Sequence, residues 1–170
     1  MMAEIYLAGG CFWGMEKYIG LIHGVQTTEV GYANGKTENP TYEQVCRENT
    51  GHAETVRVCY DTEVVSLEFL LNLYFDAIDP TAVNRQGGDT GTQYRTGIYY
   101  TDKNDREIIE RSLEALQKQY TERIAVECKP LENFSRAETY HQSYLDKNPS
   151  GYCHIGKDKF QKAAEAVPNR

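Results

Sequence analysis

Strand-like and helix-like segments follow one another along this chain in an order that few folds accommodate. Short apolar or alternating segments indicate strands over residues 5–8, 25–33, 55–60, 96–100 and 124–128. Helical periodicity follows the first and the third of these strands. Short insertions aside, the order β-α-β-β-α-β predicts a split βαβ plait, in which helices cover one face of an antiparallel sheet. We therefore expect an α+β fold: a two-layer ferredoxin-like plait with an added helix and strand and a long C-terminal coil.

The clearest helix is the one over residues 67–78. Its apolar residues recur at the helical period and so share one face; they are Leu67, Leu70, Leu71, Tyr74, Phe75 and Ile78. The pair Asp79-Pro80 ends this helix, because a residue before proline is forced out of the helical region. Further helices are expected over 13–22 and 42–47, around Ile109 to Tyr120 and near Ala137 to Leu145.

Length and charge limit the class of protein. The 170 residues suit one domain, and we expect a catalytic domain over 1–155 and a polar tail or cut linker over 156–170. The net charge of −7 and the lack of a basic stripe argue against nucleic-acid binding. No apolar run reaches the roughly 18 residues that a membrane span needs, and Glu4 stands where a signal peptide would carry positive charge. We expect a cytoplasmic monomer that does not bind membranes.

The cysteines do not form a recognisable scaffold. The chain has five, too few for a disulfide framework at this length and with no C-x-x-C pair: Cys11, Cys46, Cys59, Cys128 and Cys153. In a reducing compartment such thiols are free, metal-bound or catalytic. The histidines show no ligand spacing, so we expect no metal site. Residues 31–37 resemble a P-loop but are one residue short of that motif, so we expect no nucleotide.

The densest functional signal is the run Gly9-Gly10-Cys11-Phe12-Trp13. Two glycines after a strand allow a sharp turn and leave room for a ligand. Cys11 then stands at the start of a helix, where unpaired N–H groups favour a thiolate and lower the pKa. Phe12 and Trp13 suggest an apolar wall beside this sulfur. The same residues also fit an inert buried cysteine with two core aromatics.

Two other segments carry groups that could act with a thiol. Glu54 opens a strand, where partial burial would raise its pKa and make it an acid near neutral pH. A solvated surface carboxylate is the alternative. Cys153 lies in a C-terminal segment with Pro149 and Gly151, from which it could reach a second thiol. It fits an idle surface thiol equally well.

A glycine-rich loop supplies further polar candidates. Residues 87–95 could present the carboxylate of Asp89, the phenol of Tyr94 and the guanidinium of Arg95 to one site, or form only a turn. Tyr42 is another candidate phenol, although a half-buried packing tyrosine has the same signal.

Taken together, these clusters resemble the motifs of the methionine sulfoxide reductase A family, in order and over nearly the whole chain. The matching segments are GGCFWG, GYANG with NPTYEQVC, GHAE, NRQGGDTGTQYR and HQSYLDKNPSGYCHI. The chain especially resembles the A half of fused A–B reductases. The resemblance implies reduction of the S epimer of methionine sulfoxide, free, peptidyl or within oxidised proteins.

The resemblance also implies the steps of the reaction. Cys11 matches the nucleophile, Glu54 the acid, and Cys153 the resolving cysteine that converts a sulfenic acid on Cys11 into a disulfide. Thioredoxin would reduce that disulfide, and no metal, flavin or other cofactor is needed.

The remaining matches surround the substrate. Tyr42, Asp89 and Tyr94 match the groups that hydrogen-bond the sulfoxide oxygen, directly or through water. Phe12 and Trp13 match the pocket for the methyl group.

Two alternatives remain open at this point. A cysteine hydrolase or acyltransferase would need His52 or His141 within hydrogen-bond reach of Cys11. A non-enzymatic redox sensor would use Cys11 and Cys153 to switch a partner surface, without turnover of a sulfoxide.

Overall fold

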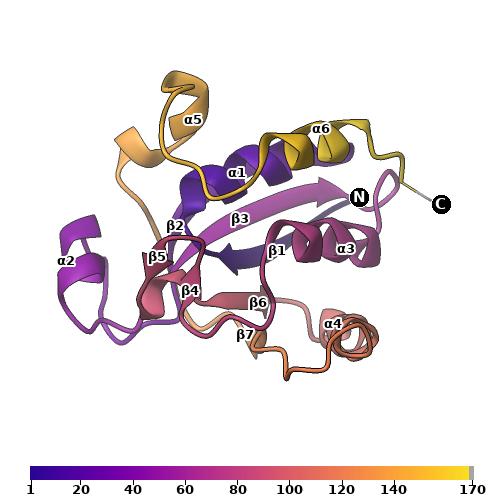
Figure 1. Cartoon of the computed structure of the whole chain (residues 1–170), viewed down its shortest axis with the longest axis horizontal. Coiled ribbons are helices and arrows are strands. Elements are labelled where there is room, and N and C mark those ends of the chain that lie inside the picture. The colour runs from indigo at the N-terminus through magenta and orange to yellow at the C-terminus, as the bar shows by residue number, and fades with distance from the viewer. Residues whose placement is uncertain (169–170) are drawn as a thin grey trace.

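A six-stranded sheet forms the centre of the computed structural model, which describes residues 1–168 (Figure 1). The strands are β1 (Met2–Gly9), β2 (Val25–Ala33), β3 (Ala53–Asp61), β6 (Thr96–Tyr100), β7 (Glu127–Pro130) and β8 (Phe134–Arg136). They lie in the order β7-β6-β1-β3-β2-β8, and every neighbouring pair is antiparallel except β6 with β7. The inner four strands have the order of a split βαβ plait, so the predicted fold is confirmed.

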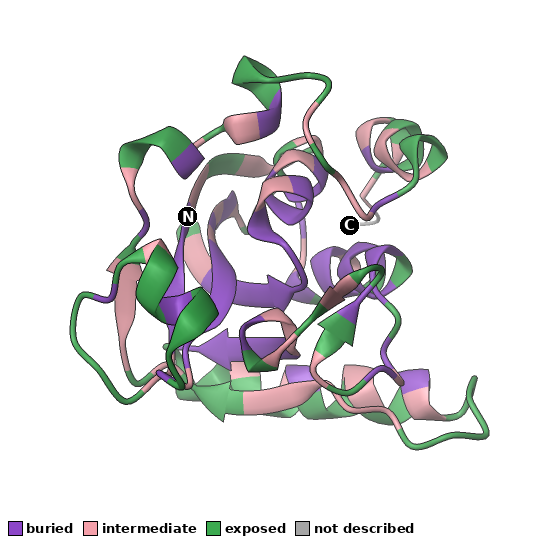
Figure 2. Cartoon of the chain, turned by 60° about the vertical axis from the view of Figure 1, so that its left-hand side comes forward, coloured by how far each residue is buried: buried purple, intermediate pink, exposed green. Residues whose placement is uncertain are grey.

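Helices cover one face of this sheet. Those that pack on it are α1 (Phe12–Gly20), α3 (Leu67–Ala77) and α4 (Lys103–Gln117). Outside them, α5 (Tyr144–Lys147) packs on α1 and α6 (Lys157–Glu165) on α1 and α3, while α2 (Tyr42–Arg47) lies to the side of the sheet. α1 packs across β1, β2 and β3, while α3 lies between α1 and α4, and α4 reaches β6 and β7. Ile5 and Leu7 of β1 point into this core, together with the whole predicted apolar face of α3. Figure 2 shows the buried residues gathered in the central strands and on the helix sides next to them.

The opposite face of the sheet carries a smaller apolar cluster. It contains Tyr6 of β1 and Tyr99 of β6, and Leu131 and Phe134 pack against it. The chain therefore crosses to this second face between β7 and β8.

The region before the C-terminus differs from its prediction. Instead of one helix near 137–145, the chain forms β8, the 3-10 turn η2 (Thr139–His141) and the short helix α5. One local and one long-range feature prevent a continuous helix. Ser143 has the left-handed φ of 52°, and the Gln142 side chain bonds both the N–H and the C=O of Val30 on β2. Docking onto β2 therefore overrides the local helical pattern.

Two further predictions need correction. The last predicted strand, over 124–128, is shifted to 127–130, where it pairs with β6. The predicted C-terminal coil contains α6, whose Ala163 is buried and whose Phe160 packs on the core. The helix is amphipathic with a narrow apolar face, which explains why the segment looks merely polar. The division at residue 155 stays a prediction.

Across residues 1–168 no helix is long and apolar enough to cross a membrane.

Tyr74 links α3 to the strands that lead into the Cys11 segment. Its hydroxyl donates to the Ala8 carbonyl at 2.5 Å and accepts from the Gly97 N–H at 3.2 Å, all within the buried core. This hydroxyl therefore satisfies polar backbone groups of both β1 and β6 where water has no access.

We expect Tyr74→Phe to lower the free energy of unfolding by about 1–3 kcal/mol, because it removes the hydroxyl that bonds both of these buried groups. Urea unfolding followed by circular dichroism measures the change. Tyr120→Phe, at an exposed tyrosine, is the matched control and should unfold like the parent. Equal midpoints for all three proteins would contradict this role of Tyr74.

Candidate active site

Cys11 lies at the junction between β1 and α1. β1 ends at Gly9, Gly10 turns the chain with a φ of +82°, and Cys11 directly precedes the first turn of α1. A side chain at position 10 has no room, since its Cβ would lie 2.7 Å from the Cβ of Gln86. The glycine thus permits the turn that leaves the Cys11 thiol buried, with 9% exposure, at the end of the sheet.

Glu54 reaches the same place from the start of β3. Its side chain is 1% exposed, and Oε1 accepts the Phe12 N–H at 3.2 Å. Oε2 is buried and has no hydrogen-bond partner within residues 1–168. Burial raises the pKa of Glu54 to about 8; the Phe12 N–H opposes this shift and the charge of Asp89 adds to it. Glu54 is therefore a largely protonated acid at neutral pH, with one oxygen free to meet a ligand, and not a solvated surface carboxylate.

The prediction of a low pKa for Cys11 is wrong. Burial raises the pKa of the thiol, and the charge of Glu54 raises it further. A hydrogen bond from the Trp13 N–H, at the helix start, lowers it by less. The helix terminus thus acts as expected but is outweighed, because burial removes the water that would stabilise a thiolate.

Tyr42 and Tyr94 bring two phenols to Glu54 from separate elements. Tyr42 is the first residue of α2, whose start is held by a capping box between Thr41 and Gln44. Tyr94 ends the 3-10 turn η1 (Thr92–Tyr94). Burial raises the pKa of both hydroxyls, and the Glu54 charge is the next largest cause for each. Both groups stay protonated and can donate to an oxygen bound beside Glu54.

The glycine-rich loop forms a two-stranded hairpin, β4 (Arg85–Gln86) with β5 (Asp89–Thr90). Asp89 turns toward the site, where its Oδ2 is buried without a partner in the described chain and its charge raises the pKa of Cys11 and Glu54. Arg95 does not join it. The Arg95 guanidinium forms an ion pair with Glu127 of β7 at 2.7 Å. It therefore points to the edge of the sheet and not into the site.

Aromatic rings form a wall beside the thiol. Phe12 is buried within α1, and the Trp13 indole donates from Nε1 to Nδ1 of His141 at 2.9 Å. The Trp13 ring also stacks on Tyr144, with centroids 3.7 Å apart and an interplanar angle of 7°. Tyr42 packs on His141 at 4.6 Å. Phe12 and Trp13 thus belong to an aromatic cluster at the start of α1, which also includes His141 and Tyr144, for which only the HQSY run gave a signal.

Cys153 lies over the first turn of α1. A Cβ at Gly14 would be 2.8 Å from the Cys153 sulfur, and the charge of Cys153 is among the causes that raise the pKa of Cys11. The next residue, His154, bonds the Gly9 carbonyl at 3.0 Å through Nε2 and so pins the segment to the end of β1. The structure therefore places both thiols of the predicted pair at the start of α1, with no disulfide between them.

Cys46 is a neighbour that the sequence did not single out. Burial raises the pKa of its thiol, and hydrogen bonds with Tyr42 and Tyr94 oppose the shift. A position four residues after Tyr42 on the same short helix was the available signal, since such residues share a helix face.

His52 and His141, the two histidines of the hydrolase alternative, do not supply a base for Cys11. His52 Nε2 lies 2.7 Å from the Thr37 carbonyl, and His141 Nδ1 accepts from Trp13. Neither ring hydrogen-bonds the Cys11 sulfur, so the hydrolase alternative lacks its base. Among residues 1–168 no group of three or more His, Cys, Asp or Glu side chains is placed to hold a metal ion.

A thiol beside a protonated carboxyl group, two phenols and a second thiol defines an enzyme of the thiol oxidoreductase class. The chain belongs to the peptide methionine sulfoxide reductase family, whose model matches residues 3–169. It is 63% identical over 166 residues to the peptide methionine sulfoxide reductase MsrA of Lachnoclostridium phytofermentans, covering 98% of this chain and 100% of that protein. The resemblance found in the sequence motifs is thereby confirmed. The finer likeness to the A half of a fused reductase stays a prediction.

Solved structures agree with this assignment. Mxr1 from Saccharomyces cerevisiae in reduced form has a TM-score of 0.85 and 36% identity, over 99% of this chain and 93% of that one. Mxr1 in complex with Trx2 has a TM-score of 0.62 and 25% identity, over 91% and 87% of the two chains.

Glu54→Gln should change how stability depends on pH. The pKa of Glu54 rises from an ordinary 4.5 to about 8 on folding, so the folded protein holds this proton more tightly. That contribution to stability is present below about pH 4.5 and is lost as the pH rises toward 8, at roughly 1.4 kcal/mol per pH unit. The amide of the variant cannot ionise, so urea unfolding at several pH values should show the parent losing stability relative to the variant. Parallel curves between about pH 5 and pH 8 would contradict the raised pKa.

Proposed function

We propose that this chain reduces the S epimer of methionine sulfoxide, free or within oxidised proteins, with Cys11 as the nucleophile and Glu54 as the proton donor. The observation that carries this proposal is the buried, protonated Glu54 with an unbonded oxygen beside Cys11. A sulfoxide sulfur is a poor electrophile while its oxygen keeps its charge. A proton from Glu54 and hydrogen bonds from Tyr42 and Tyr94 neutralise that oxygen as it leaves.

The first step transfers the oxygen from methionine to Cys11. The Cys11 sulfur bonds to the sulfoxide sulfur while the oxygen takes the Glu54 proton, and the proton given up by Cys11 restores Glu54. The hydroxyl then moves to the Cys11 sulfur as its bond to the methionine sulfur and the bond between the two sulfurs break. Methionine leaves with its sulfur reduced by two electrons, and Cys11 is oxidised by two to a sulfenic acid. The positive end of the S–O dipole lies against Cys11 in this encounter, so the substrate favours the thiolate that burial disfavours in the resting site.

The other residues hold the substrate. Asp89 keeps the Glu54 pKa high and orients water at the sulfoxide oxygen, an arrangement supported by its buried, unbonded Oδ2. Phe12 and Trp13 receive the methyl group. Their rings offer an apolar contact next to the sulfur, and that contact favours a methyl group over a polar substituent.

The second step returns Cys11 to its reduced form. The Cys153 thiol condenses with the sulfenic acid, releasing water and forming a disulfide. A thioredoxin dithiol then reduces this disulfide and becomes a disulfide itself. The position of Cys153 over α1 supports the first part, and the similarity to Mxr1 in complex with Trx2 supports the second. The steps balance without a metal, flavin or nucleotide. We place the reaction in the cytoplasm and assign it to a monomer.

Glu54→Gln should lower the single-turnover rate of methionine formation by about 10²- to 10⁴-fold at neutral pH, the usual range for a missing general acid. The parent rate should also lose its acid-dependent part as the pH rises through about 8, where Glu54 ionises. Glu63→Gln, at an exposed glutamate, is the matched control. A variant rate within a few-fold of the parent would remove Glu54 from the mechanism.

Cys153→Ser should separate the two steps. One methionine per enzyme should still form, because Cys11 and Glu54 are untouched, and the protein should stop as a sulfenic acid. Dithiothreitol should restore cycling, whereas thioredoxin, which attacks a disulfide, should not. Coupled turnover and single-turnover yield are measured together, with Cys59→Ser as the control and Cys11→Ser as the inactive reference. Normal thioredoxin-dependent cycling of the variant would pass the resolving role to another thiol. If the parent enzyme forms no methionine, the redox-sensor alternative is favoured instead.

A further inference from the structure

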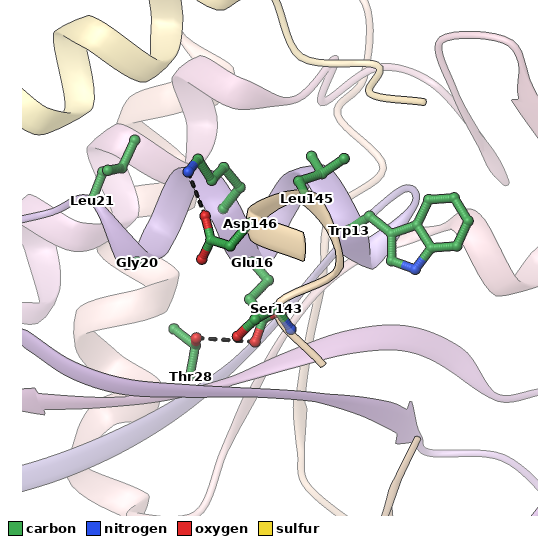
Figure 3. A pocket seen from close by; sticks show the side chains of 9 residues that line it. Trp13, Glu16, Gly20, Leu21, Thr28, Ser143, Leu145 and Asp146 are labelled. Carbon is green, nitrogen blue, oxygen red and sulfur yellow. Dashed lines mark hydrogen bonds and ion pairs between the residues drawn. The ribbon is translucent and has the colours of Figure 1, made fainter. Parts of the chain in front are cut away.

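Helix α1 carries a second buried carboxylate that the proposed reaction does not use. Glu16 is 5% exposed; its Oε1 accepts the Ser143 N–H at 2.7 Å and its Oε2 accepts the Thr28 hydroxyl at 3.1 Å. Figure 3 shows its side chain extending from α1 between these two partners, beside a small cavity whose other wall includes Trp13 and Leu145. A carboxylate is costly to bury unless it is bonded in this way, so the position calls for a physical reason.

The main partner of Glu16 is a strained residue. Ser143 has φ 52° and ψ 38°, a left-handed conformation that residues other than glycine rarely adopt. Its side chain does not cap α5, and its N–H is held by Glu16. Gln142, next to it, is fixed to β2 through Val30. Glu16 and Gln142 thus anchor the turn between η2 and α5 from two sides.

The residues flanking this turn hold the Trp13 indole. His141 accepts the indole N–H at 2.9 Å, and Tyr144 stacks on the ring at 3.7 Å. Trp13 itself lies three residues before Glu16 on α1. Two residues of α1 therefore contact the same short segment: Glu16 bonds Ser143, and Trp13 stacks on the neighbouring Tyr144.

We propose that Glu16 is a positioning residue for substrate binding. By holding Ser143 it fixes His141 and Tyr144 against Trp13, and so sets the orientation of the indole that receives the methyl group. This inference rests on the proposed role of Trp13 in sulfoxide binding. A ring fixed in one orientation keeps the pocket in its binding shape, whereas a ring free to turn binds the same group less well.

The test uses the fact that Trp13 is the only tryptophan of the chain, so its fluorescence reports on this ring alone. Glu16→Leu removes the acceptor at similar size. We expect a red-shifted emission, stronger quenching by acrylamide, and a half-saturating sulfoxide concentration about tenfold higher in single turnovers, with the maximal rate within about threefold. Glu16→Gln keeps an acceptor for Ser143 and should restore most of each property.

Two controls distinguish positioning from a general loss of structure. Lys17→Ala removes the exposed ion pair between α1 and Asp146 of α5 and should change none of these readouts, because exposed pairs contribute little. In a Tyr144→Ala background the stacking contact on Trp13 is already lost. Adding Glu16→Leu should therefore raise the half-saturating concentration less than about twofold further.

The inference is overturned if Glu16→Leu leaves emission and quenching like the parent, or if its effect multiplies fully with that of Tyr144→Ala. Changed fluorescence with an unchanged half-saturating concentration would support the positioning of the indole and remove Trp13 from substrate binding, which separates the two proposals. Should Glu16→Leu fail to fold, Thr28→Val removes one partner of Glu16 at similar shape. It should shift the same readouts in the same direction, and the absence of any shift would overturn the inference.

Discussion

The hydrogen bond from the Phe12 N–H to Glu54 joins the first turn of α1 to the start of β3 in the interior of the protein. The other parts of the site are arranged around this contact. Because β3 lies between β1 and β2, its first residues come under the end of α1 that carries Cys11. The plait topology thus places an acid and a thiol side by side, although they are 43 positions apart in the chain.

Burial has opposite consequences for these two groups. It raises the pKa of Glu54 and so keeps the acid protonated, and it raises the pKa of Cys11 and so keeps the thiol unreactive. A polar sulfoxide that enters the site changes the balance, since it brings a dipole to a place where water does not screen it. In the proposed mechanism, the burial that disfavours the thiolate therefore also makes its activation selective for a bound substrate.

The last third of the chain completes the site with little regular structure. Bonds between side chains and backbone hold this segment to the plait instead. Glu16 of α1 accepts the backbone N–H of Ser143, and the side-chain amide of Gln142 bonds the backbone of Val30 on β2. His154 is attached in the same manner to the end of β1. Such side chain to backbone bonds replace the ladders of a sheet and allow a segment without long elements to keep one conformation. They explain how Tyr144, at the start of α5, and Cys153, in the segment after it, both reach α1.

Local patterns were enough to predict the plait and to single out candidate groups for the site. Period and spacing predicted the order of elements and the buried face of α3, because these features depend on neighbours within a few residues. They offered Cys11 and Glu54 as candidates beside inert alternatives, and the resemblance of the motifs to a family supplied the roles. The break of the helix at Ser143 and the pairing of Arg95 with Glu127 came only from tertiary structure. The raised pKa of Cys11 and the contacts of His141 and Tyr144 with the Trp13 indole likewise came only from tertiary structure. Each of these depends on which distant group lies opposite and on how much water is excluded there, and neither quantity is encoded in the spacing of residues along one segment.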